Sequence, residues 1–206
     1  MLPDSYYASL RCRFAGNKKE MRYILRTCAG REEYAEYVQR LIPSVQICFD
    51  KGAGAMGNFL QSLEMSGDEA VVNLEDDIWI TQGFEKKAEK AISKKPEILI
   101  QFFSMRKLDK TIGSRYDAGR SYLMGQCTYF PARMSKGILA FSKKYDRIDH
   151  KSHPLDSMIA EYLSKTKQKY WIHCPNLVDH KIGKSMIDPR RASTNRQSFT
   201  FCDREE

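Results

Sequence analysis

Apolar and polar positions follow two different rhythms along the first half of the chain. Short apolar runs rich in β-branched residues predict buried strands, and apolar residues three or four positions apart predict amphipathic helices. The expected order is strand 21–27, helix 34–41, strand 45–50, helix 56–63, a strand from 70 ending in acidic residues 75–77, helix 84–92 and strand 97–103. This alternation predicts an α/β domain with a mostly parallel central sheet flanked by helices.

The second half has a weaker pattern. Residues 104–121 are polar and contain glycine, which favours a long loop or lid, and such segments in compact domains are usually functional or mobile. A strand within 122–129, a helix at 132–141, a helix opening at 153–156 and a strand at 169–173 are expected next. We therefore divide the chain as follows: an N-terminal extension at 1–20, one catalytic domain at 21–186, and a basic C-terminal tail at 187–206, wrapped around the domain or partly disordered.

Three consecutive carboxylates, Glu75, Asp76 and Asp77, lie between two apolar runs. Desolvating an unpaired anion is very costly, so these acids must meet water, a basic partner or a metal ion. A solvated acidic turn is one interpretation. The apolar residues on both sides favour the other, a pocket at the C-terminal edge of a strand, where open α/β sheets bind ligands.

Composition narrows the function classes. In 206 residues, 42% are hydrophobic and 29% charged, and no apolar run approaches the roughly 20 residues that span a bilayer. We see no basic n-region followed by an apolar core, so we expect no signal peptide and a cytoplasmic location, in a host cytoplasm if the protein is viral.

The six cysteines form no C-x-x-C pair and are expected to be free thiols. The net charge of +8 indicates an anionic partner, or else a generally basic proteome.

The order of these features resembles a GT-A-fold glycosyltransferase. The acidic triplet matches the DXD motif of that family, in the form found in its N-acetylglucosaminyltransferases, and the later segment 175–185 (PNLVDHKIGKS) matches a C-terminal histidine motif. The resemblance covers roughly 21–186. It implies a Rossmann-like GT-A fold and transfer of a hexose or pentose from a nucleotide-sugar, a UDP-sugar above all, to an acceptor hydroxyl.

The resemblance also implies a divalent cation that stabilises the diphosphate leaving group. Carboxylate oxygens and few protein ligands suit Mn²⁺ or Mg²⁺. Asp77 would bind the metal directly, and Glu75 and Asp76 would contact the ribose, the base or metal-bound water. His180 would be the second protein ligand, with a surface loop histidine as the alternative.

The resemblance also implies roles for other residues, in binding the nucleotide-sugar donor and in the reaction. Asp156, in the first turn of its helix, is the candidate base that takes the proton from the acceptor hydroxyl in an inverting reaction; an ordinary acid at a helix N-terminus is the alternative. The expected donor contacts lie after the first strand, at the end of the second strand and near the C-terminus: Arg26, Thr27, Arg31, Asp50, Lys184 and Ser185. A solvated position is the alternative for Arg31, Lys184 and Ser185, and an ordinary strand-ending aspartate is the alternative for Asp50. Trp79 and Gly125–Gln126 are candidates to line the sugar or acceptor site, and a core position is the alternative for Trp79.

The acceptor is the least determined element. The net charge and the basic residues of 104–121 favour DNA, as in phage enzymes that glycosylate hydroxymethylated pyrimidines, with the target base flipped out of the stack. A glycan or lipid-linked acceptor is the alternative within the enzyme class. A metal-dependent nuclease or nucleotidyltransferase, and a non-catalytic DNA-binding module, are the alternatives outside it.

Overall fold

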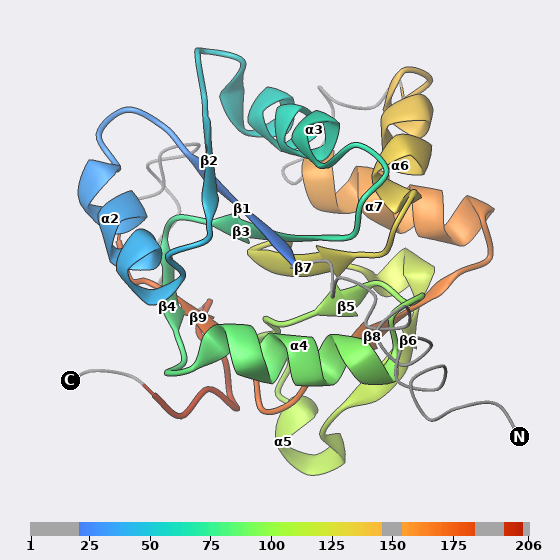
Figure 1. Ribbon diagram of the computed structural model, residues 1–206. Helices are drawn as coiled ribbons and strands as arrows, with labels where there is room; N and C mark the ends of the chain where they lie inside the picture. Colours follow the sequence, from blue (N-terminus) through green and yellow to red (C-terminus); the bar gives the residue numbers. More distant parts are fainter. Residues whose placement is uncertain (1–20, 146–153, 184–195, 204–206) are drawn as a thin grey trace, which may run out of the picture.

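The computed structural model describes residues 21–145, 154–183 and 196–203. Its strands are β1 Arg22–Thr27, β2 Gln46–Phe49, β3 Val71–Glu75, β4 Ile78–Ile80, β5 Ile100–Gln101, β6 Arg115–Ala118, β7 Cys127–Phe130, β8 Lys169–Ile172 and β9 Val178–His180. Its helices are α2 Glu32–Leu41, α3 Gly54–Ser66, α4 Phe84–Lys94, α5 Asp109–Ile112, α6 Met134–Ser142 and α7 Pro154–Lys165, with a 3₁₀ turn η1 at Gly119–Ser121 (Figure 1).

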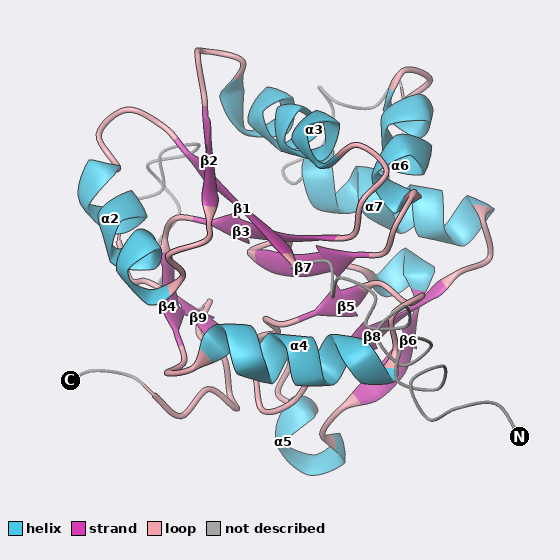
Figure 2. Cartoon of the chain, in the orientation of Figure 1, coloured by secondary structure: helices cyan, strands magenta, loops and turns pink. Residues whose placement is uncertain are grey.

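The main sheet has the strand order β2-β1-β3-β7-β5-β8-β6. Strands β2, β1, β3, β5 and β8 run in one direction, because β7 is antiparallel to both of its neighbours, and β6 is antiparallel to β8. The chain is therefore α/β with a mixed, mostly parallel sheet, as the sequence predicts. A second sheet pairs β4 with β9 and lies near α2 (Figure 2).

Helices cover both faces of the main sheet. Side chains of α2 and α4 join one core cluster, and side chains of α3, α6 and α7 join a second one. Successive residues of β1 enter different clusters: Tyr23 and Leu25 pack in the first and Ile24 in the second. A strand buried on both faces favours apolar residues at successive positions, which explains the apolar run Tyr23–Leu25.

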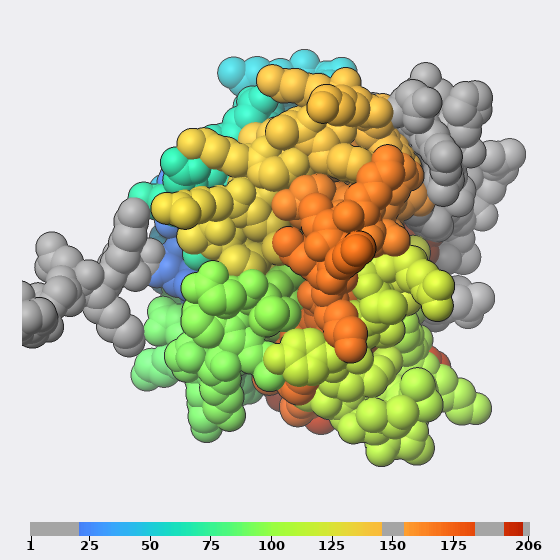
Figure 3. All heavy atoms as spheres, turned by 90° about the vertical axis from the view of Figure 1, so that its right-hand side faces the viewer, coloured from blue at the N-terminus to red at the C-terminus, as the bar shows by residue number. Residues whose placement is uncertain are grey.

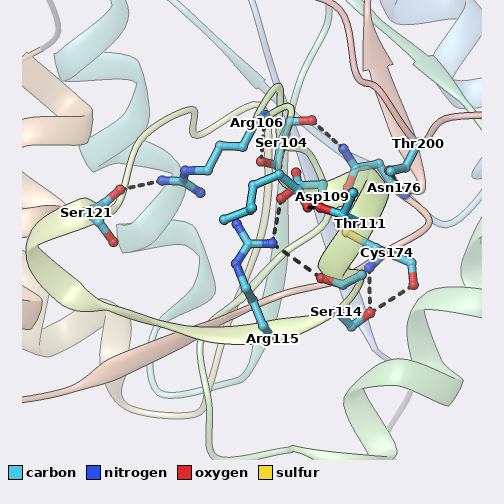
Figure 4. Close-up of polar contacts among 12 residues, drawn as sticks. Ser104, Arg106, Asp109, Thr111, Ser114, Arg115, Ser121, Cys174, Asn176 and Thr200 are labelled. Carbon is cyan, nitrogen blue, oxygen red and sulfur yellow. Dashed lines mark hydrogen bonds and ion pairs between the residues drawn. The ribbon is translucent and has the colours of Figure 1, made fainter.

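The segment 104–121 differs from the long loop predicted from the sequence. It contains α5, β6 and η1, and it packs beside α7 and β8 on the face shown in Figure 3. Figure 4 shows the polar contacts that hold it. Arg115 pairs with the buried Asp109 at 2.6 Å, and Arg106 donates to the Ser121 carbonyl and the Tyr170 hydroxyl. These internal contacts replace the solvation that the polar composition suggested.

Three other differences concern short elements. The strand expected at 97–103 is reduced to two paired residues, and the strand expected at 122–129 begins only at Cys127. The third difference is that the structure contains two strands, β4 and β9, that the sequence did not predict. Each has three residues, too few to show an alternating pattern of apolar and polar positions. In the C-terminal tail, the described residues 196–203 pack against the domain: Ser198 N donates to Asp179 Oδ1 at 2.5 Å and Phe201 is buried. In the described part of the chain, no helix has the length and apolar character that crossing a membrane requires.

Candidate active site

The candidate site lies where β1 and β3 end side by side. Arg26 of β1 is in register with Glu75 of β3, and both strands run in the same direction. After β1 the chain passes through α2 to β2 on one side, and after β3 it passes through α4 to β5 on the other. The connections diverge, so this edge is a topological switch point, where open α/β sheets bind ligands. The acidic triplet is at the edge that the sequence predicts.

The short β4–β9 sheet brings the most distant pair of predicted site residues together. Ile78 pairs with His180, and Lys181 N donates to the Asp77 carbonyl at 2.8 Å. As a result, His180 Nε2 lies 3.6 Å from Asp77 Oδ2, although the two residues are far apart in sequence. The two residues expected to bind a metal therefore face each other.

The backbone also determines which nitrogen of His180 faces the acid. Nδ1 lies 2.7 Å from the carbonyl oxygen of Lys181, which can only accept, so Nδ1 carries the proton in this hydrogen bond. In the neutral imidazole, Nε2 then presents a lone pair to the Asp77 carboxylate. Two electron-rich atoms at this distance are stable when a proton or a cation lies between them. A histidine that donates its other N–H to a backbone carbonyl is also the usual form of a metal ligand.

Arg31 and Asp76 continue the site toward β1. Asp76 accepts from Thr27 Oγ1 at 2.7 Å and from Arg31 Nη1 at 3.2 Å. The same guanidinium nitrogen lies 3.4 Å from Asp77 Oδ2. Burial raises the pKa of Asp76 to about 6, opposed by the hydrogen bond from Thr27 and reinforced by the charge of Asp77. Thr27 and Arg31, which were expected at the donor site, are thus bound directly to the acidic cluster.

Arg26 has a different environment from the one expected of a donor contact. It is 5% exposed, and its guanidinium binds Asn73 Oδ1 at 2.6 Å, Glu75 Oε1 at 3.1 Å and the Gly125 carbonyl at 3.1 Å. It also lies over the Phe59 ring, 5.3 Å from its centroid. These protein partners occupy the guanidinium, which therefore orients Glu75. Burial raises the pKa of Glu75, and the positive charge of Arg26 opposes this.

Asp156 lies in the first turn of α7 and is connected to Glu75 of the acidic triplet through two residues, Gly125 and Arg26. Gly125 N donates to Asp156 Oδ1 at 3.0 Å, while the carbonyl of Gly125 accepts from Arg26. Burial raises the pKa of Asp156, against the lowering effect of its backbone hydrogen bonds. A partly buried carboxylate held in one orientation, with its pKa raised, has the properties of a general base.

The remaining predicted residues have simpler outcomes. Asp50 follows β2, and one of its carboxylate oxygens accepts from Gly52 N and Ala53 N, a structural role in the turn before α3. Lys184 and Ser185 lie outside the described residues. Trp79 is half-buried and packs edge-on against Tyr37, with ring centroids 5.5 Å apart.

Sequence reasoning missed Lys181. Its ammonium lies over the rings of Tyr34, Tyr37 and Trp79, 4.6, 3.8 and 4.6 Å from their centroids. Burial lowers the pKa of Lys181 to about 8, opposed by the charges of the neighbouring acids. Because its backbone holds both His180 and Asp77, the cage of rings around its side chain anchors that pair. Two aromatic residues three positions apart on a helix were a weak signal, since they are typical of any core.

The side chains of Asp77 and His180 fit a divalent cation that is coordinated mainly by a bound phosphate and by water. The described residues contain no group of three or more His, Cys, Asp or Glu side chains arranged to bind a metal. Asp77 and His180 offer two donor atoms 3.6 Å apart, and two ligands on neighbouring corners of an octahedron with bonds of about 2.1 Å lie roughly 3 Å apart. Mg²⁺ commonly takes one or two carboxylates and completes its shell with water and substrate phosphates. The residues present therefore suit a metal that arrives with a phosphate ligand.

Comparisons with protein-family models and with curated proteins find no match for this chain. The functional argument therefore rests on the geometry of the acidic cluster, His180 and Asp156.

Proposed function

We propose that the protein is a metal-dependent glycosyltransferase of the GT-A type that moves a sugar from a nucleotide-sugar, a UDP-sugar by preference, to an acceptor hydroxyl. One observation carries the proposal: His180 Nε2, in the tautomer set by the Lys181 carbonyl, faces Asp77 Oδ2 at the switch point of an α/β sheet. Two protein ligands are too few for a stand-alone structural site, but they suit a cation shared with a diphosphate.

The residues of the chain divide the reaction between binding and proton transfer. Asp77 and His180 would hold Mn²⁺ or Mg²⁺, and the cation, when bound, supplies charge stabilisation to the departing diphosphate. Thr27 orients Asp76 at the same edge, and Arg26 orients Glu75, so the two acids present fixed acceptors to a ribose or to metal-bound water. These contacts act before the chemical step by positioning the donor.

Asp156 supplies the base. The acceptor oxygen forms a bond to the anomeric carbon as the bond from that carbon to the diphosphate oxygen breaks. The proton of the acceptor hydroxyl passes to Asp156, whose raised pKa makes it a stronger base than an ordinary aspartate. Direct displacement by a hydroxyl on the face opposite the diphosphate inverts the anomeric configuration.

For the acceptor we propose DNA bearing a hydroxymethylated pyrimidine, on the basis of the net charge of +8. In the structure, only some of the basic side chains of 104–121 are exposed and could contact DNA. Within 104–121, Arg106 and Arg115 make internal contacts, whereas Lys107, Lys110 and Arg120 are exposed. DNA retardation that weakens steeply with salt would support this acceptor, and no retardation at low salt would exclude it in favour of a glycan or lipid-linked acceptor.

The function is tested by incubating the protein with Mn²⁺ and a panel of nucleotide-sugars, and measuring release of the nucleoside diphosphate. Asp77→Asn and His180→Ala should each lose at least a hundredfold in rate while keeping the circular dichroism spectrum of the wild type. Arg22→Gln, which alters a half-exposed ion pair with Glu69, is the matched control and should retain activity. Cleavage of DNA, or nucleotide transfer without sugar turnover, would replace the proposal by the nuclease or nucleotidyltransferase alternative.

A further inference from the structure

The side chain of Arg31 lies where the proposed cation would act. Its Nη1 is 3.4 Å from Asp77 Oδ2, the same oxygen that His180 faces, and 3.2 Å from Asp76 Oδ1. The side chain of Arg31 is 11% exposed, so the guanidinium is largely withdrawn from solvent. In this arrangement, Arg31 pairs with Asp77, the acid that would bind the metal, and with Asp76 beside it.

The placement of Arg31 creates a competition. A dication on Asp77 and His180 would lie close to the guanidinium, and like charges at short range in a partly buried site repel strongly. Lys181 adds a second positive charge nearby, with its ammonium in the cage formed by Tyr34, Tyr37 and Trp79. A dication that arrives without a phosphate would therefore compete with Arg31 for the carboxylates of Asp76 and Asp77.

A diphosphate would change this balance. A guanidinium forms forked hydrogen bonds to phosphate as readily as to carboxylate, so Arg31 can exchange its carboxylate partners for phosphate oxygens. The phosphate oxygens also complete the metal shell. Arg31 starts from the loop that joins β1 to α2, at the N-cap position of α2, and its contacts outside the acidic cluster include the Tyr34 ring, 5.0 Å from its guanidinium carbon. It can therefore turn about this ring without disturbing a strand.

We propose that Arg31 is a competing cation that makes metal binding conditional on the donor diphosphate, so that the two bind cooperatively. The proposal rests on the metal-dependent sugar transfer proposed above, and it adds a regulatory role for one residue of that site. Its consequence is that the metal binds weakly to the free protein and tightly to the nucleotide complex. An interaction of this kind between two ligands typically changes affinity by 5- to 150-fold.

The test measures Mn²⁺ binding directly, by the electron paramagnetic resonance signal of free Mn²⁺, with and without saturating UDP. Parallel titrations of Mn²⁺ with UDP alone correct for their complex in solution. For the wild type, UDP should tighten Mn²⁺ binding at least fivefold. In Arg31→Gln, Mn²⁺ should bind the free protein at least fivefold more tightly than in the wild type, and the effect of UDP should fall below twofold. Arg31→Lys, which keeps the charge but cannot form the forked hydrogen bonds of a guanidinium to phosphate, should be intermediate.

Two controls separate the possible failures. Arg22→Gln removes the same charge far from the acids and should behave as the wild type; an equal gain of Mn²⁺ affinity in this variant would overturn the role of Arg31. Unchanged or weaker Mn²⁺ binding by folded Arg31→Gln would also overturn it, leaving the metal site intact. If Asp77→Asn binds Mn²⁺ as well as the wild type does, the metal site is refuted and both proposals fail together.

Discussion

The buried pair of Asp109 and Arg115 allows a decisive test of whether residues 104–121 form a lid or part of the fixed frame. The carboxylate of Asp109 is fully buried, while the Arg115 side chain is 15% exposed and its Nη1 lies 2.6 Å from Asp109 Oδ1 (Figure 4). Asp109 Oδ2 has no hydrogen-bond partner among the described residues. Arg115→Met therefore leaves a buried acid without its cation.

Breaking a buried ion pair from one side typically costs about 3–5 kcal/mol of unfolding free energy. We take about 3 kcal/mol, since Arg115 is partly exposed and part of the Coulomb energy is screened. For a chain of this size, that corresponds to a fall of roughly 6–12 °C in the midpoint of thermal unfolding. Asp109→Asn should cost less, because the partly exposed Arg115 retains the Gly113 carbonyl as an acceptor and can reach water.

Thermal unfolding followed by circular dichroism measures both variants, with Lys107→Met as a control that removes an exposed cation from the same segment. A surface change of that kind is expected to stay within about 0.5 kcal/mol of wild type. If Arg115→Met unfolds within about 2 °C of Lys107→Met and limited proteolysis now cuts within 104–121, the segment opens on its own. The segment would then be a lid, as the sequence predicts, and the interpretation as fixed frame would be wrong.

Three further predictions concern the reaction and the fold. Asp156→Asn should abolish sugar transfer and leave UDP binding unchanged. In the wild type, the transfer rate should fall as pH falls, because the base is protonated. The raised pKa of Asp156 should place this fall at higher pH than for an ordinary aspartate. Gly125→Ala places a Cβ 3.0 Å from Leu155 Cδ2 and 3.4 Å from Asp156 Oδ1, so kcat should fall at least tenfold with little loss of stability. Gly119→Ala places a Cβ 2.6 Å from the Gln168 carbonyl oxygen, and urea unfolding should show a loss of about 1–3 kcal/mol.

The elements that the sequence predicted well are those with long, regular patterns. Helical spacing of apolar residues located the helices α2, α3 and α4 to within a few residues, and short apolar runs located the strands β1 and β3 as closely. Segment 104–121 escaped prediction because its stabilising groups are charged. A pattern of polar residues cannot show that Asp109 and Arg115 satisfy each other in the interior.

The prediction of the site had a similar limit. The acidic triplet could be placed at a sheet edge from its apolar neighbours, since burial of an unpaired anion is costly. The partnership of Asp77 with His180 came from a resemblance, and the contact itself depends on β4 and β9, which are too short to be detected by periodicity. Arg26 and Arg31 gave the same sequence signal, a cation at or shortly after the end of the first predicted strand. Only the structure shows that Arg26 binds Asn73 and Glu75, whereas Arg31 binds Asp76 and Asp77.

The two arginines also show why the order of charges along a chain is a poor guide to ligand binding. Arg26 is on the strand, and it cannot exchange a partner for a ligand without leaving the buried Asn73 side chain or the Glu75 carboxylate without its hydrogen-bond donor. Arg31 lies four residues beyond the end of β1, at the N-cap of α2, and its partners are the carboxylates of Asp76 and Asp77, near which the proposed cation would bind. A side chain can move to bind a ligand when other groups can take over the ion pairs and hydrogen bonds that it leaves. By this criterion Arg31 can move when a ligand binds, and Arg26 keeps its position.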